Sequence, residues 1–379
     1  MQIGSFLERI TRPTAHVVTL RQGRRPGILR AAPLLLLLGI ATDPTPAIAG
    51  PTQVIKRPDR TAVEALAFSP DGRWLAVGSS APAAEADRLP EGTIELWELN
   101  PPRLTSVLRQ SAWTPGSDLA NAVTSLAFSP DGRSLLVGHC GGHAIWDLQT
   151  RQQRLAWRTI FNSRDTSPAW APDGRSVAIP WFPFDEPTVN GIAIMDATTG
   201  RQSAFWPVEG GYVRSLRFSP DGTLLATAGH DSAVRVFHVP TRTNVFTEMT
   251  GSTLWAAGFA PDNRTLVAGP VIGGALRRYL CAPNDAGSIQ VRQQGSTAPT
   301  REEIHDIEFT RGGDRAVTVS HAGLRIWNPS DWSTVAQIAG CIGRLTPDGR
   351  SLALVRGTKP ESIEIWPLHD LETSLARQP

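Results

Sequence analysis

The chain has 379 residues, of which 41% are hydrophobic and 19% charged, with a mean hydropathy of −0.16. These values fit a folded chain with its own apolar core, and they exclude a disordered tail or a protein of many membrane spans. The formal net charge is +2, but six of the 37 basic residues lie in the first 49 positions, and the remainder has a slight excess of acids. We therefore expect no nucleic-acid partner, because such a partner requires a concentrated basic face.

The first 49 residues are typical of an export signal. A basic stretch that includes Arg24, Arg25 and Arg30 precedes the apolar run 31–41, and a proline-containing break leads to the small residues 47–49 (Ala-Ile-Ala). This order indicates a cleavable signal peptide over residues 1–49. The apolar run is shorter than the roughly 20 residues of a membrane-spanning helix, so a cleaved signal is favoured over an anchor. A twin-arginine signal and an organelle transit peptide are weaker alternatives. We expect a periplasmic or secreted protein that is not inserted in a membrane after cleavage.

Three cysteines, Cys140, Cys281 and Cys341, are scattered over the rest of the chain. They are too few and too far apart for a disulfide scaffold or for a zinc site, which needs close pairs of ligands. An oxidising compartment would permit one disulfide and leave one free thiol. Small buried apolar residues are the preferred interpretation.

One sequence pattern recurs seven times after the signal. Each copy has an alternating apolar strand that usually ends in an aromatic residue, a tight turn, a second apolar strand, a short turn and a third strand that ends near an aromatic. The turns, mostly of the S-P-D-G type, span 69–72, 129–132, 171–174, 219–222, 260–263, 310–313 and 346–349. The sixth turn departs most, because it reads Thr-Arg-Gly-Gly. The copies are spaced by about 46 residues on average, a period typical of four-stranded propeller blades.

The repeats predict an all-β fold in which residues 50–379 form one domain. We expect a seven-bladed β-propeller of four-stranded antiparallel sheets, with fourth strands such as 104–109 following each third strand. Closing the sheets into a ring removes their exposed edges. The segment 52–57 is left over before the first copy. We predict that it pairs beside 363–366 and closes the ring as the outer strand of the last blade.

These repeats resemble the WD-repeat (WD40-like) family of β-propellers. The resemblance covers about residues 52–368 and is strongest in the fourth copy, 213–239. Trp146-Asp147 is the one literal WD dipeptide, and the Gly-His dipeptide that precedes the first strand in family members is missing from every copy. The segment 168–174 is most similar to the looser repeats of exported bacterial propellers.

The recurring polar residues of the repeats favour structure over chemistry. An aspartate recurs in six of the turns, where its side chain bonds neighbouring backbone, and each aspartate belongs to a different blade. His139, His230 and His321 recur near hairpin tips of alternate blades, so the intervening blades keep them apart. Solvated turn residues are the ordinary interpretation of these histidines. We predict no metal site and no cofactor.

The residues that face the predicted channel are mostly small. Arg217, Glu308 and Arg344 are the charged exceptions at that position of the innermost strands. We find no G-x-S-x-G elbow, no H-E-x-x-H pair and no glycine loop that would cradle a phosphate. The sequence therefore predicts a protein without catalytic residues that is not an enzyme.

Loop length distinguishes the two faces of the predicted ring. The long connections lie almost entirely on the face opposite the S-P-D-G turns, and loops held by a rigid scaffold often carry function. The candidate partner-binding residues are Trp181, Phe182, Phe184, Asp185, Glu186 and, in another connection of the same face, Trp113. Aromatic anchors of this kind dominate protein interfaces. The alternative is that the rings fold back over the adjacent blade or over the mouth of the channel.

Two functions from different classes remain open. The first is a non-catalytic scaffold or recognition module outside the cytoplasm, expected as a monomer with another protein as its partner. The alternative is an extracytoplasmic propeller hydrolase or small-ligand sensor that acts at the mouth of the channel. A tightly bound metal or ligand in the purified protein would favour that alternative.

Overall fold

The chain of this computed structural model divides into two units, Met1–Ala47 and Ile48–Pro379. The structure describes residues 50–58, 61–80, 92–110, 122–139, 141–159, 167–182, 189–271, 274–300, 302–320, 322–339, 341–356 and 362–375. All of these residues belong to the second unit. None of the helices in these segments is long and apolar enough to cross a bilayer.

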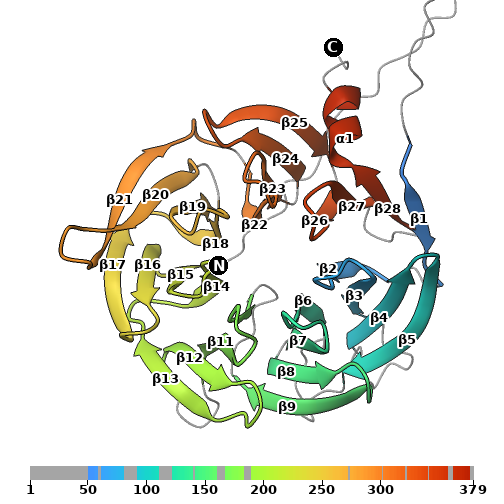
Figure 1. Ribbon diagram of the computed structural model, residues 1–379, viewed down its shortest axis with the longest axis horizontal. Helices are drawn as coiled ribbons and strands as arrows, with labels where there is room; N and C mark the ends of the chain where they lie inside the picture. Colours follow the sequence, from blue (N-terminus) through green and yellow to red (C-terminus); the bar gives the residue numbers. More distant parts are fainter. Residues whose placement is uncertain are drawn as a thin grey trace, which may run out of the picture. The chain divides into compact units, whose positions relative to one another are not determined.

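The second unit is a ring of seven four-stranded antiparallel sheets, the β-propeller that the repeats predict (Figure 1). The first strand of blades 1 to 6 lies next to the axis and the fourth at the rim. Blade 1 is β2 (Val63–Phe68), β3 (Trp74–Ser80), β4 (Gly92–Leu99) and β5 (Pro102–Gln110). Blade 2 is β6 (Val123–Phe128), β7 (Ser134–His139), β8 (Gly142–Asp147) and β9 (Gln152–Arg158). Blade 3 is β10 (Ala169–Trp170), β11 (Ser176–Trp181), β12 (Gly191–Asp196) and β13 (Gln202–Pro207).

The remaining blades continue the same order of strands. Blade 4 is β14 (Val213–Phe218), β15 (Leu224–Gly229), β16 (Ala233–His238) and β17 (Thr243–Met249). Blade 5 is β18 (Leu254–Phe259), β19 (Thr265–Pro270), β20 (Arg277–Pro283) and β21 (Ile289–Ser296). Blade 6 is β22 (Ile304–Phe309), β23 (Ala316–Ser320), β24 (Gly323–Asn328) and β25 (Ser333–Ala339). Blade 7 is β26 (Cys341–Leu345), β27 (Ser351–Arg356), β28 (Ser362–Pro367) and the N-terminal β1 (Gln53–Lys56).

The ring closes through β1, as predicted. This strand pairs antiparallel with β28, with Gln53 opposite Ile365 and Lys56 opposite Ser362. The backbone N–H and the hydroxyl of Thr52 both donate to the Ile365 carbonyl, at 2.8 and 3.0 Å. The first described strand of the chain therefore completes the last blade.

A buried ion pair ties this closure to blade 1. Arg57 follows β1 directly, and its guanidinium lies 2.9 Å from the carboxylate of Glu95 on β4, with both side chains almost fully enclosed. The indole N–H of Trp97 donates to the same carboxylate at 2.9 Å, and the Arg57 guanidinium donates to the Thr61 carbonyl at 2.8 Å. The closing strand is thus held by the last blade on one side and by the first blade on the other.

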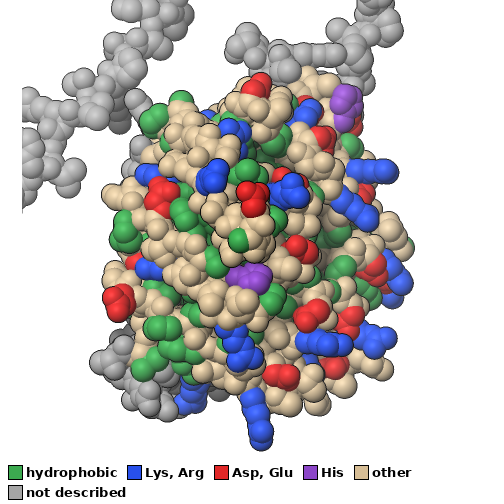
Figure 2. Space-filling model, turned by 60° about the vertical axis from the view of Figure 1, so that its left-hand side comes forward, with side chains coloured by type: hydrophobic (Ala, Val, Ile, Leu, Met, Phe, Trp, Pro, Cys, Tyr) green, Lys and Arg blue, Asp and Glu red, His purple; other side chains and the backbone are tan. Residues whose placement is uncertain are grey.

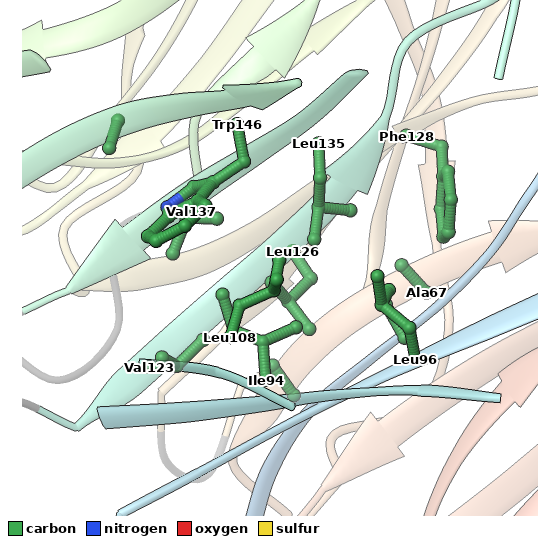
Figure 3. Close-up of a cluster of buried hydrophobic side chains, with 13 residues drawn as sticks. Ala67, Ile94, Leu96, Leu108, Val123, Leu126, Phe128, Leu135, Val137 and Trp146 are labelled. Carbon is green, nitrogen blue, oxygen red and sulfur yellow. The ribbon is translucent and has the colours of Figure 1, made fainter. Parts of the chain in front are cut away.

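Apolar side chains fill the seams between neighbouring blades. In the seam between blades 1 and 2, Ile94 and Leu96 from β4 meet Leu126 and Phe128 from β6 and Leu135 from β7 (Figure 3). Alternation along each strand provides these contacts, because successive side chains point to opposite faces of the sheet and each face packs on a neighbour. Full burial of one such side chain contributes roughly 2 kcal/mol.

Each tight turn is held by a small network of hydrogen bonds. In the first turn, Oδ1 of Asp71 accepts from the Ser69 hydroxyl at 2.5 Å and from the Arg73 backbone N–H at 3.0 Å. The Ser69 hydroxyl oxygen also accepts from the Trp74 N–H at 2.9 Å, where β3 begins. Gly72 adopts φ of 70°, a left-handed conformation that glycine adopts without steric cost.

The sixth turn keeps this network although its sequence departs from the pattern. The Thr310 hydroxyl bonds the carboxylate of Asp314 at 2.7 Å and accepts from the Arg315 N–H at 3.0 Å. Asp314, which follows the turn, thus takes the role of the aspartate that the other turns carry at their third position. The fifth turn also differs, since Asn263 adopts the left-handed φ of 59° at the glycine position.

A short C-terminal helix, α1 (Leu368–Leu375), follows β28 and has no counterpart in the sequence-based prediction. Leu368 and Leu371 are buried in the apolar cluster formed by blades 6 and 7. The Glu372 carboxylate accepts from the Arg315 guanidinium at 2.6 Å. The helix therefore caps the seam between these blades at the level of the turns.

Cys281 is a free and buried thiol in the core of blade 5. Burial raises the pKa of this thiol to about 12, and the negative charge of Asp262 acts in the same direction. A buried apolar role therefore suits Cys281. The side chains of Cys140 and Cys341 lie outside the described residues.

Candidate functional site

The two faces of the ring differ in the length of their connections. The turn face carries the seven tight turns between the first and second strands and the links between the third and fourth strands. The opposite face, here called the connection face, carries the links between second and third strands and between blades. The long connections 81–91, 111–121, 160–166 and 183–188 join strand ends on the connection face and lie outside the described residues. The extended hairpin of β20 and β21 is an exception on the turn face.

The structure describes two of the six predicted partner-binding residues. Trp181 is the last residue of β11, opposite Gly191, and packs half-buried against the apolar cluster of blades 2 and 3. Phe182 is only 4% exposed, and its ring meets that of Tyr212 edge to face at 4.9 Å. Both described rings therefore pack against the propeller. Phe184, Asp185, Glu186 and Trp113 lie outside the described residues.

Tyr212 is an aromatic residue that the sequence analysis did not single out. It lies in the connection between blades 3 and 4, and 49% of its surface is exposed. The Gly210-Gly211 pair before it, with φ of 86° and 150°, places the ring beside Phe182. The sequence could have pointed to Tyr212, because it is an aromatic residue in a connection between two blades.

A hollow of about 510 Å³ lies in blade 3, lined by residues that neighbour Phe182 and Tyr212 in the structure but not by this pair itself. Its lining includes Asn190, Phe205, Pro207 and Glu209, and we call it the blade 3 hollow. The Asn190 side-chain amide donates to the Gly211 carbonyl at 2.5 Å, which fixes the connection between blades 3 and 4 against β12. The connection face thus has an aromatic and acidic depression next to the predicted binding segment.

Four charged side chains form a brace across the axial channel. The Asp306 carboxylate on β22 accepts from Arg217 of β14 at 2.6 Å and from Arg344 of β26 at 2.5 Å. The Arg344 guanidinium also lies 2.7 Å from the Glu308 carboxylate, which accepts from the Leu345 N–H at 2.8 Å. Blades 4, 6 and 7 are therefore joined through the channel. We call Arg217, Asp306, Glu308 and Arg344 the channel brace.

The pKa values of the two carboxyl groups of the brace are shifted in opposite directions. Burial opposes the ionisation of Asp306, but the Arg217 and Arg344 guanidinium groups hold its pKa below the usual range. Burial raises the pKa of Glu308, and the negative charge of Asp306 adds to this effect while Arg344 opposes it. The brace thus stabilises the charged form of Asp306 more than the charged form of Glu308. The three charged positions predicted to face the channel are all part of it.

Above the brace, toward the connection face, the channel contains a polar pocket of about 200 Å³. The hydroxyl residues Thr124, Ser125, Ser167 and Ser320 line it, together with Glu64. Within the described residues Glu64 makes no hydrogen bond and no ion pair.

The basic side chains of this pocket are held by an aromatic stack. The Arg214 guanidinium lies 3.8 Å from the centre of the Trp255 ring and 3.3 Å from Nε2 of His230. The His305 ring also packs against the Trp255 ring, and the two ring centroids lie 4.7 Å apart. These groups therefore form a fixed wall of the pocket.

No cluster of three or more histidine, cysteine or acidic side chains that could hold a metal ion occurs in the described segments. His139 is buried at the end of β7 in blade 2, so its interpretation as a solvated turn residue is wrong, whereas His230 is exposed next to β15 in blade 4. His321 lies outside the described residues. Burial, with the nearby His139, lowers the pKa of His143 to about 3, so His143 is neutral at physiological pH.

Comparisons with known proteins support the propeller assignment. The family model "WD domain, G-beta repeat" matches residues 51–98, 113–147 and 204–238. A curated relative, the "WD repeat-containing protein SL1-17" of Schistosoma mansoni, is 34% identical over 155 residues, which cover 39% of this chain and 44% of that protein. The match thus spans less than half the length of the curated relative.

A solved structure shares the fold. The β-propeller domain of Cps50 (Swd1) from Myceliophteria thermophila superposes with a TM-score of 0.66 at 18% sequence identity, covering 84% of this chain and 99% of that domain. Both named relatives are eukaryotic, so the resemblance to exported bacterial propellers stays a prediction. The matched repeats and the shared fold make this chain similar to the WD-repeat β-propellers.

Proposed function

We propose that this protein is a non-catalytic interaction scaffold that recognises a partner protein through its connection face. The observation that carries this proposal is the exposed Tyr212 ring packed on Phe182, together with the blade 3 hollow that Glu209 and Gly210, just before Tyr212 in the chain, help to line. An exposed aromatic residue next to a depression gives a partner a place to bury an anchor. The rigid blades hold this surface in place, so little ordering entropy is lost on binding.

The chemistry of the channel supports a non-catalytic role. The four charged groups of the brace pair with one another and with backbone groups, which leaves none of them poised to exchange a proton with a substrate. Figure 2 shows that Lys and Arg side chains intermix with Asp and Glu on the side of the molecule that it presents. Such a mixed surface suits a protein partner better than a polyanion.

We place the protein outside the cytoplasm on the basis of residues 1–49. Their basic stretch, short apolar run and small-residue site form a signal-peptide pattern. Cell fractionation with N-terminal sequencing tests this part of the proposal. A mature chain that starts near residue 50 in an extracytoplasmic fraction is expected, whereas an intact N-terminus in the cytosol would contradict export.

Partner capture with cross-linking tests the binding surface. Tyr212→Ser combined with Phe184→Ser should abolish a cross-linked partner that the unchanged protein captures, because the first removes exposed aromatic surface from the connection face and the second removes a predicted anchor of the segment 183–188. Met249→Ser is the matched control, since Met249 is 65% exposed on the outer strand of blade 4. Retention of the partner by the double variant, at an unchanged melting temperature, would rule out this surface.

The polar pocket of the channel keeps a second candidate function open. A pocket of about 200 Å³ with an unpaired carboxylate at Glu64 and four hydroxyl residues could hold a small polar ligand, as a ligand sensor or hydrolase requires. Native mass spectrometry of the purified protein would decide between the two. A bound small molecule that is lost in Glu64→Gln would favour the second candidate.

A further inference from the structure

The seven repeats allow each seam between blades to be compared with the others. In the seam between blades 2 and 3, Leu155 of β9 packs against the position of Gly200, and the Trp157 indole N–H donates to the Gly200 carbonyl at 2.9 Å. In the next seam, the Trp206 indole N–H of β13 donates to the Arg242 carbonyl at 2.9 Å. The outer strand of each of these blades therefore seals its seam on the turn face.

Blade 1 carries different residues at the same register positions. Ser106 lies opposite Leu96 of β4, as Leu155 lies opposite Ile145 in blade 2. The equivalent residues in blades 3, 4 and 6 are apolar: Ala204, Phe246 and Ala336. Leu108 in turn replaces the tryptophan of blades 2 and 3, and leucine has no side-chain N–H to donate. The leucine that packs in the seam between blades 2 and 3, and the tryptophan that seals this seam and the next, are thus both missing from blade 1.

An apolar groove of about 250 Å³ remains at this seam. Its walls are Trp74, Leu96, Phe128 and Leu148, so it opens next to the buried cluster of blades 1 and 2 shown in Figure 3. We call it the seam groove. It lies on the turn face, away from the connection face on which the proposed function rests.

Two arginines give the seam groove a positive edge. Arg133 and Arg151 line it and are exposed, and neither guanidinium makes a hydrogen bond or an ion pair within the described residues. The nearby acids are engaged in their own turns. Asp131 accepts from the Ser129 hydroxyl and Arg133 N–H, and Asp147 accepts from Thr150. Among the described residues that line the groove, none is acidic.

We infer that the seam groove binds an acidic peptide segment of a partner protein, with one large apolar side chain inserted between blades 1 and 2. The apolar walls take the anchor, and carboxylates beside it pair with Arg133 and Arg151. Charge-assisted hydrogen bonds from two guanidinium groups fix the orientation of the segment. The inference does not depend on the connection face.

Peptide binding to the full chain tests this inference. The probe is a fluorescent peptide, Asp-Glu-Phe-Asp-Glu, measured by anisotropy, with Asp-Glu-Ser-Asp-Glu and Lys-Lys-Phe-Lys-Lys as comparison peptides. Ser106→Leu fills the groove with the residue that blade 2 carries, so binding should weaken by about tenfold or more, which is about 1.4 kcal/mol. Val107→Leu is the matched control, because Val107 is the next residue of β5 and is 44% exposed.

Two further readouts locate the binding. The indole N–H signal of Trp74, identified by its loss in Trp74→Phe, should shift on addition of the first peptide and not of the serine peptide. Combined Arg133→Gln and Arg151→Gln should weaken binding several-fold and reduce its dependence on salt. The melting temperature of Ser106→Leu should equal or exceed that of the unchanged protein, because the substitution buries apolar surface.

The following results would overturn the inference. Equal affinity of the Ser106→Leu and unchanged proteins would exclude the groove, and equal affinity for the lysine peptide would exclude the acidic partner. If the unchanged protein does not bind the first peptide, no acidic partner enters the seam groove. This conclusion holds even if a segment of the chain itself covers the groove. A dimer that Ser106→Leu converts to a monomer would assign the groove to a second copy. Because these variants lie on the turn face, their outcome is independent of the partner captured through Tyr212 and Phe184.

Discussion

Single aspartates of the tight turns hold the ends of two strands together. Oδ1 of Asp221 accepts from the Ser219 hydroxyl at 2.6 Å, from the Thr223 N–H at 3.0 Å and from the Thr223 hydroxyl at 2.9 Å. Burial opposes the ionisation of Asp221, but these hydrogen bonds outweigh it and lower the pKa of the carboxyl group. Asp221 is thus a structural group whose contribution depends on pH.

The predicted effect of Asp221→Ala is a loss of about 1 kcal/mol in the free energy of unfolding at pH 7. The folded pKa lies below the unfolded value of about 3.9, so the contribution is present above that pH and disappears as the pH falls through the folded pKa. Urea unfolding at pH 7 and at pH 3 measures the change. Asp285→Ala, an exposed aspartate in the turn before β21, is the control and should have almost no effect. An equal loss for Asp221→Ala at both pH values would contradict this role.

The buried pair of Arg57 and Glu95 should matter far more than an exposed pair. Glu95→Gln removes a charge that faces Arg57 in an enclosed site, which should cost about 3 kcal/mol because an uncompensated guanidinium remains. Glu98→Gln is the matched control on the same strand, since its partner Arg103 is 70% exposed and such pairs contribute less than about 1 kcal/mol. Chemical denaturation of the two variants gives the comparison. Similar losses for both would show that burial of the first pair has no special effect.

At the scale of elements, the closing strand β1 is the one that joins the ends of the propeller. Ile55 is completely buried in the cluster that blade 1 shares with blade 7, while its neighbour Val54 is 45% exposed. Ile55→Ala should therefore lower the free energy of unfolding by about 2–4 kcal/mol through lost burial and the cavity left behind. Val54→Ala should change it by less than about 0.5 kcal/mol. Equal effects would mean that β1 is not packed as an integral strand of blade 7.

The blades and their closure could be predicted because their signals are local and repeated. Alternating apolar residues between turns at a period of about 46 residues define four strands, and the leftover segment 52–57 has one vacant edge to fill. Helix α1 was not predicted, because it is short and depends on burying Leu368 and Leu371 against blades 6 and 7. Its formation is a tertiary effect that no local pattern shows.

The candidate sites were harder to predict than the strands. Trp181 and Phe182 were singled out from composition, but the packing of Phe182 involves Tyr212, which lies about 30 residues away and follows a glycine pair. The seam groove depends on the absence of a side chain, since Ser106 only stands out once the register shows that Leu155 occupies the equivalent place. Differences of this kind between blades are visible only when the strand pairing of each blade is known. The sequence of a single segment does not show them.

At the scale of the whole molecule, the channel brace links blades that are not neighbours. Arg217 belongs to blade 4 and Asp306 to blade 6, so their ion pair passes the intervening blade 5. Gly258 of blade 5 lets β18 lie close to β22 of blade 6, because a Cβ atom at that position would approach the Ile307 carbonyl oxygen within 2.6 Å. The brace therefore couples the inner strands of the ring around a narrow channel, and disturbing it should affect several blades together.

Asp306 and Glu308 should contribute to stability with opposite dependence on pH. The folded pKa of Asp306 is lowered, so its contribution is present above its unfolded pKa of about 3.9 and is lost on acidification. The folded pKa of Glu308 is raised, so its contribution is present below its unfolded pKa of about 4.3 and is lost as the pH rises through the folded value. At pH 7.5, Asp306→Asn should cost about 2–3 kcal/mol through two weakened charge-assisted hydrogen bonds. Glu308→Gln should cost less, because burial and the negative charge of Asp306 raise the pKa of Glu308 and so weaken the stabilisation of its charged form.

Urea unfolding of both variants between pH 3 and pH 8 tests the opposite signs. The cost of Asp306→Asn should shrink toward pH 3, and that of Glu308→Gln should shrink as the pH rises above about 4.3. Glu64→Gln is the control within the same channel, since Glu64 makes no hydrogen bond or ion pair with the described part of the chain and should change stability little at any pH. Parallel pH profiles for the Asp306 and Glu308 variants would contradict the opposite shifts of the two pKa values.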